Sequence, residues 1–480
     1  MKHTDIFIIN KIEGIMTNKL SNQKQMPELV KSIFREYDIR GIYPDELNEG
    51  SIAEISKSIA KKCHKESIDE VVIARDGRLS GPSLLESLQE SLNKHGINTI
   101  NIGLATSPLL YYAAKKQVSK SGIMITGSHN PKNYNGIKLV INDKPVSGTE
   151  IFELSKIDIS SENLNGVNRF LDIKDVYITE VKNNFHFEKL KVVVDCGNGA
   201  AGVIAPDLLR AVGCEVIEIF CDVDGNFPNH HPDPGKEKNL VDLIEKVKEV
   251  SADVGVAFDG DGDRLGAVTS SGRLIYPDQM MMLFSKKILS KEGDKTIIFD
   301  VKCSDFLPQI IKENDGIPFM SPTGHFHIKN NIKKHNAALG GEMSGHIFFN
   351  DIWHGFDDGH YSAIRLLDIM NETGSSLDDL LNSLPVSYST PELNIDVPEE
   401  KKFKIIEDFI ENASIDGEKD FTDGLRASFE NGWALLRASN TTPKLVLRFE
   451  ANSQESLEKI QNNFLEELKK FLPNEDINLE

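Results

Sequence analysis

The segment from 121 to 138 contains a serine that is placed to react rather than to pack. It reads Ser-Gly-Ile-Met-Ile-Thr-Gly-Ser-His-Asn-Pro-Lys-Asn-Tyr-Asn-Gly-Ile-Lys, and Ser128 follows a short apolar strand predicted over 123–125. Pro131 lacks a backbone donor and biases Asn130 away from helix, so the serine lies on a rigid turn at a strand end. Such a hydroxyl could carry a transferred group. The alternative is a turn whose Ser and Asn side chains bond their own backbone.

Two hydrolase arrangements do not fit this turn. The Gly-x-Ser-x-Gly elbow needs a glycine where Thr126 stands. The neighbouring Ser128 and His129 need not face each other, so the sequence does not imply a Ser-His dyad.

Three aspartates at alternate positions follow a buried strand predicted over 252–258. The run Asp-Gly-Asp-Gly-Asp-Arg spans 259–264. Its glycines let the loop curl, and three converging carboxylates suit Mg²⁺ or Mn²⁺, since like charges this close are unfavourable without a cation. An EF-hand fails because Arg264 and Ser270 stand at its glycine and closing glutamate positions. An aspartyl-phosphate Asp-x-Asp nucleophile is less natural beside a third aspartate and an arginine.

Two further loops could hold a phosphorylated sugar. The segment 340–346 reads Gly-Gly-Glu-Met-Ser-Gly-His, and Glu342 and Ser344 could both reach one polyol. The segment 437–443 reads Arg-Ala-Ser-Asn-Thr-Thr-Pro, whose guanidinium, hydroxyl, amide and backbone donors match a phosphate. Together with the serine and the aspartates, these loops predict phosphoryl transfer on a phosphorylated sugar.

The chain resembles the α-D-phosphohexomutases, and most of all the bacterial bifunctional phosphomannomutase/phosphoglucomutase type. The resemblance extends from about Phe34 to Glu450. Its motifs are Phe-Arg-Glu-Tyr-Asp-Ile-Arg-Gly at 34–41, Thr-Gly-Ser-His-Asn-Pro at 126–131, the run at 259–264, Val-Lys-Cys at 301–303, Thr-Gly-His at 323–325, Gly-Glu-Met-Ser-Gly-His at 341–346 and Arg-Ala-Ser-Asn-Thr at 437–441. The chain departs from the family at 235–238 and in the extra segment before Phe34.

The resemblance implies an enzyme that interconverts hexose 1- and 6-phosphates, of mannose and/or glucose, through a phosphoserine. A hexose 1,6-bisphosphate would be both intermediate and activator. The implied catalytic residues are Ser128, His129, Lys138, Arg40, Arg264, His325 and His346, and which of Lys138, Arg40, His325 and His346 transfers protons stays open. One Mg²⁺ would be held by Ser128, Asp259, Asp261 and Asp263. The implied substrate contacts are Tyr37, Lys302, His325, Glu342, Met343, Ser344, Gly345, His346, Arg437, Ala438, Ser439, Asn440 and Thr441.

Two alternative functions are considered. Phosphoglucosamine mutases share the fold but typically carry Gln in place of Met343, and Gly-Thr in place of the dipeptide at 440–441. A non-catalytic regulator that binds phosphosugars should have lost Ser128 or one of the metal carboxylates, and none is missing.

The elements that must position these loops repeat along the chain. Apolar strands predicted at 71–75, 190–194 and 296–299 each stop at an aspartate, namely Asp76, Asp195 and Asp300, and helical patterns follow the first two at 83–92 and 205–211. This alternation predicts three similar α/β domains with mixed, mostly parallel sheets.

The last part of the chain differs from the three repeats. Short elements at 406–410, 433–437 and 444–449, with an amphipathic helix near 457–471, predict a smaller C-terminal α+β domain. We therefore place an N-terminal extension at 1–31 and four domains around a central cleft, at 32–174, 175–273, 274–388 and 389–480. The polar extension is expected to be dispensable.

One glycine run imitates a cofactor site. Gly197-Asn-Gly199-Ala-Ala-Gly202 follows a predicted strand, and Glu218 or Asp222 lies about 20 residues on, as in the dinucleotide fingerprint. The other motifs require no nicotinamide, so we interpret this run as an ordinary turn of the second domain.

Composition narrows the class of protein. At 480 residues the chain exceeds one core, and a net charge of −20 argues against nucleic acid and anionic membrane as partners. No apolar run approaches the roughly 18 residues of a membrane span. The 5 cysteines form no Cys-x-x-Cys and indicate reduced thiols of a cytoplasmic protein. The expected partners are phosphorylated hexoses, and the expected state is a monomer or a homodimer.

Overall fold

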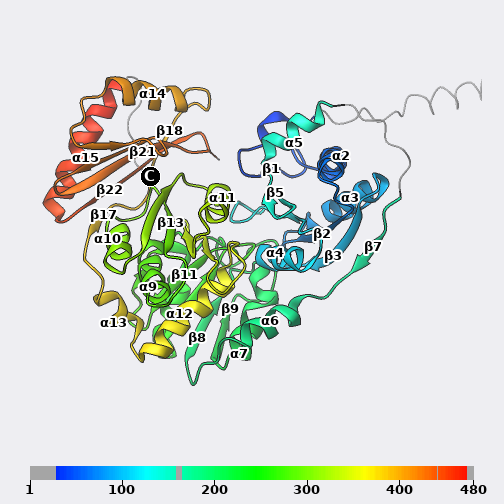
Figure 1. The fold of residues 1–480 in the computed structure, drawn as a ribbon, viewed down its shortest axis with the longest axis horizontal. Coiled ribbons are helices and arrows are strands. Elements are labelled where there is room, and N and C mark those ends of the chain that lie inside the picture. Colours follow the sequence, from blue (N-terminus) through cyan, green and yellow to red (C-terminus); the bar gives the residue numbers. More distant parts are fainter. Residues whose placement is uncertain (1–28, 158–164, 441, 473–480) are drawn as a thin grey trace, which may run out of the picture.

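Four units follow one another along the chain, each built on its own β-sheet. The computed structural model describes residues 29–157, 165–440 and 442–472, so residues 1–28 of the expected extension lie outside the described residues. Figure 1 shows the four units in an arc, with the first and the fourth at its two ends. Within the described residues, no helix is long and apolar enough to cross a membrane.

The first two units hold most of the helices and strands that surround the serine and aspartate loops. The first contains β1 (Ile39–Ile42), α2 (Glu49–Lys65), β2 (Glu70–Arg75), α3 (Gly81–Lys94), β3 (Asn98–Leu104), α4 (Ser107–Lys116), β4 (Gly122–Ile125), β5 (Tyr134–Ile141), β6 (Lys144–Pro145), α5 (Gly148–Ser155) and β7 (Asn168–Phe170). The second contains α6 (Lys174–Lys182), β8 (Lys191–Asp195), α7 (Ala205–Ala211), β9 (Glu215–Ile219), α8 (Val241–Glu249), β10 (Val254–Phe258), β11 (Leu265–Thr269) and β12 (Leu274–Ile275).

The third unit resembles the first two, whereas the fourth has a different architecture, as expected. The third contains α9 (Pro277–Leu289), β13 (Thr296–Asp300), α10 (Phe306–Glu313), β14 (Ile317–Ser321), α11 (His325–His335), β15 (Leu339–Gly341), β16 (Ile347–Phe349), α12 (Gly359–Thr373) and α13 (Leu377–Asn382). The fourth contains β17 (Tyr388–Ser389), β18 (Leu393–Asp396), α14 (Lys402–Asn412), β19 (Glu418–Asp420), β20 (Leu425–Phe429), β21 (Gly432–Ala438), β22 (Lys444–Ala451) and α15 (Gln454–Leu468). The predicted α/β class with a smaller α+β domain is confirmed. The domain limits stay predictions, and β12 lies just beyond the one placed at 273.

The first three sheets repeat one arrangement of four strands. Their orders are β1-β5-β4-β2-β3-β7, β12-β11-β10-β8-β9 and β14-β13-β15-β16. In each, three strands pair in parallel, and the next strand returns antiparallel beside the third: β5 on β4, β11 on β10 and β16 on β15. A short loop can join only antiparallel neighbours, whereas parallel strands need a crossover helix. The sheets are mixed, as predicted, because the third strand of each set ends in a tight return.

A buried carboxylate joins the second and third units, and the aromatic rings around it extend the contact to the first unit. Asp358 lies before α12 and accepts hydrogen bonds from Tyr177 Oη at 2.7 Å, Trp353 Nε1 at 3.1 Å and the Tyr361 N–H at 3.0 Å. The Trp353 ring stacks on Tyr361 with centroids 4.2 Å apart, and it meets Tyr177 and Tyr112 at 5.5 and 5.9 Å. Burial raises the pKa of Asp358 to about 6.

Asp358→Ala is expected to destabilise the protein by about 3 kcal/mol, because three buried donors lose their acceptor. Urea unfolding followed by circular dichroism measures this. The matched control is Glu245→Ala, which removes an exposed helical carboxylate. An unfolding midpoint equal to that of the control would contradict the assignment of Asp358 as a tie between units.

Candidate active site

Each of the four predicted loops follows one strand in its own unit, and the four loops lie close together. The serine loop joins β4 to β5, the aspartate loop joins β10 to β11, and the Glu342 loop joins β15 to β16. Ser128 Oγ donates to Asp259 Oδ2 at 3.1 Å, and Arg264 Nε lies 3.3 Å from His346 Nε2. Asn440, from the loop between β21 and β22, donates to the Tyr37 hydroxyl. Predicted residues from all four units therefore gather in one place.

Ser128 is buried and held in an unusual backbone conformation. Its φ of +48° lies in the left-handed region, and its N–H donates to Thr126 Oγ1 at 2.8 Å. Such strain at a non-glycine residue is typical of functional turns. The Ser128 Oγ lies 3.2 Å from His129 Nδ1, so the two side chains do face each other. Burial, followed by the charges of Arg264 and Arg40, lowers the pKa of His129 well below its ordinary value.

Two residues that sequence reasoning missed hold the serine loop. Asp76, which the sequence marked only as a strand end, accepts from Thr126 Oγ1 at 2.7 Å and from the Gly127 N–H at 3.1 Å. Arg78 is fully buried and donates to backbone carbonyls of the loop, those of Ser128 at 2.7 Å, Asn130 at 2.6 Å, Pro131 at 2.6 Å and Tyr134 at 2.9 Å. No sequence signal singled out Arg78, because its partners are backbone atoms of a distant loop.

The three aspartates converge as the sequence predicts. Asp259, Asp261 and Asp263 are fully buried, and one oxygen from each lies within 4.8 Å of the others. Lys138 Nζ donates to Asp261 Oδ2 at 2.6 Å and to Asp263 Oδ2 at 2.5 Å. Within the described part of the chain, Asp261 Oδ1 has no hydrogen-bond partner. Buried ligands that are all oxygen atoms, one of them without a hydrogen bond to any described residue, fit a hard divalent cation such as Mg²⁺.

The charges around this group are strongly shifted. Burial and the neighbouring Asp263 and Asp261 raise the pKa of Asp259 well above its ordinary value. Burial opposes the charge of Lys138 too, but Asp261 and Asp263 raise its pKa well above the usual range. Lys138 therefore stays cationic, and only part of the aspartates' charge is balanced by protein groups.

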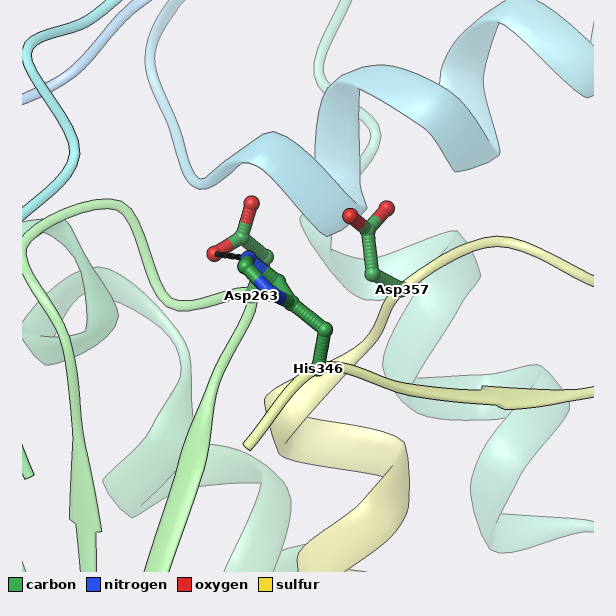
Figure 2. Close-up of side chains that lie close together, drawn as sticks. All are labelled: Asp263, His346 and Asp357. Carbon is green, nitrogen blue, oxygen red and sulfur yellow. Dashed lines mark ion pairs between the residues drawn. The ribbon is translucent and has the colours of Figure 1, made fainter. Parts of the chain in front are cut away.

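A second group of side chains lies next to the first. Figure 2 shows Asp263, His346 and Asp357 together, with the ion pair between His346 Nε2 and Asp263 Oδ1, which measures 3.3 Å. Burial opposes protonation of His346, but Asp263 and Glu342 raise its pKa to about 9. Asp357 is paired with Lys329 at 2.7 Å. A cationic imidazole and a neutralised carboxylate suit a metal less well than the three aspartates, so the three aspartates are the better candidate for a metal site.

The other proton-transfer candidates have different environments. His325 Nδ1 lies 3.9 Å from Asp357, and burial and then Lys329 lower the pKa of His325 well below its ordinary value. Arg40 is bonded to Asp38 and Asn130. The sequence did not mark Asp357 as a site residue, because it adjoins Asp358, which caps α12, and no local pattern distinguishes the two.

The Glu342 loop is positioned in the same way as the serine loop. Asp300 Oδ1, at the end of β13, accepts from the Met343 N–H at 3.1 Å, as Asp76 accepts from Gly127. Ser344 Oγ lies 2.9 Å from His346 Nδ1, and Gly345 has a φ of +94°. The buried Glu342 accepts from the Gly324 N–H.

The fourth unit contacts the other side of the site. Arg437 Nε donates to Asp423 at 2.8 Å, and the same carboxylate accepts from the Thr323 N–H at 3.0 Å. Lys302 Nζ donates to Glu392 at 2.9 Å. Ala438 and Ser439 are buried at the end of β21 and in the loop after it, whereas Thr441 lies outside the described residues. Tyr37 Oη donates to Thr323 O at 2.8 Å.

A pocket lies between the first and third units beside this group. Tyr37, Lys138, His325 and Lys329 are among its lining residues. The site therefore offers a hydroxyl nucleophile, a carboxylate site for a divalent cation, and nearby cationic side chains, of which Lys138 also lines the pocket. This combination can carry out metal-assisted phosphoryl transfer.

Known proteins match most of the chain, and the four domain models match it in sequence order. Family models described as phosphoglucomutase/phosphomannomutase match residues 31–158 (alpha/beta/alpha domain I), 175–272 (domain II), 276–388 (domain III) and 392–467 (C-terminal domain). A phosphomannomutase/phosphoglucomutase of Pseudomonas syringae pv. tomato is 50% identical over 456 residues, which is 94% of this chain and 98% of that protein. A phosphoglucomutase of Neisseria gonorrhoeae is 44% identical, covering 92% of this chain and 97% of its own.

A solved structure agrees with the sequence matches. A phosphoglucomutase/phosphomannomutase family protein from Burkholderia thailandensis superposes with a TM-score of 0.88 and 42% identity, covering 94% of this chain and 99% of that chain. With matches to all four domains and 50% identity over nearly its whole length, this chain belongs to the phosphoglucomutase/phosphomannomutase family.

Proposed function

We propose that this protein is a phosphohexomutase that interconverts the 1- and 6-phosphates of mannose and/or glucose through a phosphoserine at Ser128. One observation carries the proposal: the strained, buried Ser128 places its hydroxyl 3.1 Å from Asp259 of an all-carboxylate site. Hexose 1,6-bisphosphate is the intermediate and the activator. The enzyme acts in the cytoplasm as a monomer or a homodimer.

Asp259, Asp261 and Asp263, together with the Ser128 side chain, would hold one Mg²⁺. When bound, this ion would cancel negative charge on the phosphoryl group as it is attacked. Arg264 and Lys138 stabilise the remaining charge of the transition state, since Lys138 is a buried cation and Arg264 a mostly covered one beside the aspartates. Their burial removes competing water.

Of the four candidates for proton transfer, His325 is the one that burial keeps neutral. It can therefore accept a proton from a sugar hydroxyl at neutral pH, whereas Lys138 is held in its charged form by two aspartates. Arg40 offers only hydrogen-bond donors, which its guanidinium directs at Asp38 and Asn130.

The remaining loops hold the substrate. Glu342 and Ser344 bind sugar hydroxyls, and Tyr37 and Lys302 line the same side, with Met343 and Gly345 shaping the loop. The loop at 437–441 grips the phosphate that is not transferred, using the Arg437 fork and the donors of Ser439 and Asn440. Glucose 1-phosphate, mannose 1-phosphate and glucosamine 1-phosphate, compared in one assay, test the substrate class; preferred turnover of glucosamine 1-phosphate would favour the phosphoglucosamine alternative.

Ser128→Ala is expected to lower turnover roughly a thousandfold, because Thr126 is bonded within the loop and cannot replace the nucleophile. Intact mass after incubation with glucose 1,6-bisphosphate should show one added phosphoryl group on the unaltered protein and none on the variant. The control is Ser290→Ala, at an exposed helix end. More than about a tenth of the original rate in Ser128→Ala would rule out a covalent phosphoserine.

Asp261→Asn is expected to weaken Mg²⁺ binding about tenfold or more, since one of three charges is lost while the shape is kept. Calorimetric titration with Mg²⁺ measures the affinity, and excess Mg²⁺ should restore part of the turnover. Asp242→Asn, at an exposed position of α8, serves as the control. An Mg²⁺ affinity unchanged in Asp261→Asn would place the metal elsewhere.

Arg437→Ala is expected to raise KM for hexose phosphates about tenfold with a smaller change in kcat, because the lost contact holds the non-reacting phosphate. Arg437→Lys keeps the charge and loses the fork, so it should have an intermediate KM. Arg210→Ala removes a half-exposed arginine and controls for charge. A large fall in kcat at constant KM would assign Arg437 to the reacting phosphate instead.

A further inference from the structure

Two cysteines of the second unit have their sulfur atoms in contact. Cys196 directly follows β8 and is fully buried, whereas Cys221 lies just beyond β9 and is partly exposed. Their Sγ atoms are 3.4 Å apart. Both lie outside the group of residues to which we assign phosphoryl transfer.

The backbone turns the two side chains toward each other. Phe220 has a φ of +52°, which is an uncommon conformation for a bulky residue. This bend precedes Cys221 and brings its Sγ to 3.6 Å from Val194 O, on the neighbouring strand. On the other side, Gly197 and Asn198 are also left-handed, with φ of +50° and +59°. Tight turns on both chains thus hold the sulfurs together.

The turn that follows Cys196 packs directly on the aspartate loop. The Cys196 carbonyl accepts from the Gly199 N–H at 2.7 Å, and the Ala200 N–H donates to Gly260 O at 2.9 Å. A Cβ added at Gly199 would meet Gly260 atoms at 3.0 Å, and one at Gly260 would meet Ser128 O at 2.4 Å. Close contacts therefore run from Cys196 through Gly260 to the backbone of Ser128.

These contacts explain why glycines are needed in the run at 197–202, which resembles a dinucleotide motif. Gly199 lets the turn approach the aspartate loop, and a Cβ at Gly202 would lie 1.9 Å from Cys221 O. The run therefore packs the chain tightly between the cysteine pair and the metal site.

We propose that Cys196 and Cys221 are a modification site, at which hydrogen peroxide forms a disulfide that displaces Gly260 and slows turnover. The effect on turnover rests on the proposed function, whereas formation of the bond does not. The sulfurs must approach each other by about 1.4 Å to bond, and we infer that this pulls Cys196 and the turn before Gly199 toward Cys221.

The chemistry balances with one peroxide per disulfide. The thiolate of Cys221, the partly exposed residue of the pair, attacks peroxide to give a sulfenic acid and hydroxide. Burial, with the contact of Cys221, raises the pKa of Cys196 well above its ordinary value, so Cys196 enters as a thiol. Its sulfur then displaces the sulfenic hydroxyl, which leaves as water with the Cys196 proton, and the hydroxide takes up the proton first lost by Cys221. Two thiols are oxidised and one peroxide is reduced to two waters.

The test treats the full-length, reduced protein with hydrogen peroxide and maps tryptic peptides by mass under non-reducing conditions. We expect a peptide pair joined through 196 and 221 and turnover lowered about tenfold. Dithiothreitol should separate the joined peptides and restore the turnover. Cys221→Ala and Cys196→Ser should keep their turnover after peroxide. Cys214→Ser, which alters a cysteine of the same unit, should behave like the unaltered protein.

The outcomes separate the parts of the proposal. Absence of the joined peptide, or loss of turnover in Cys221→Ala after peroxide, overturns the site. The joined peptide with unchanged turnover and unchanged Mg²⁺ affinity overturns the displacement of Gly260. If the reduced protein has no mutase activity, the proposed function fails, and the peptide map and Mg²⁺ affinity still decide the disulfide.

Discussion

Three like-charged aspartates lie buried side by side, and their mutual repulsion must be balanced by charges from other parts of the chain. At 4 Å, two unit charges interact by about 4 kcal/mol at an effective dielectric constant of 20, so Asp259, Asp261 and Asp263 cannot stay ionised without nearby cations. The second unit, which carries them, does not supply enough positive charge. Lys138 comes from the first unit and His346 from the third. The need to balance this charge therefore links three units at the point where the Ser128 hydroxyl, the proposed nucleophile, lies.

A repeated strand arrangement places the serine, the aspartates and Glu342 at equivalent strand ends of three sheets. In each of the first three sheets, a short loop joins the third parallel strand to an antiparallel return, and this loop carries the serine, the aspartates or Glu342. The aspartates that end the first strand support two of these loops: Asp76 accepts from Gly127, and Asp300 accepts from Met343. In the second sheet, the equivalent Asp195 accepts a hydrogen bond from the His230 side chain at 2.9 Å instead. Burial works to lower the pKa of His230, but the charge of Asp195 outweighs it, so that this pKa is raised.

Tyr37 closes the ring of units around the site. Its hydroxyl donates to Thr323 O of the third unit and accepts from Asn440 of the fourth. Burial, with the charge of Glu36, raises its pKa so far that the hydroxyl keeps its proton and stays a donor. A side chain predicted only to line the cleft therefore also joins the two ends of the arc (Figure 1).

Sequence patterns were sufficient to predict the features whose chemistry lies within a few consecutive residues. Ser128 on its turn, the alternating aspartates, the strand ends and the α/β class are local patterns, so each could be predicted before any fold was known. The folded chain was needed to find the pairing of Lys138 with the aspartates, the hydrogen bonds from Arg78 to four backbone carbonyls, the position of Asp357 and the contact of Cys196 with Cys221. These depend on partners far apart in the chain, often backbone atoms, and no spacing or residue type in one segment encodes where a distant segment will lie.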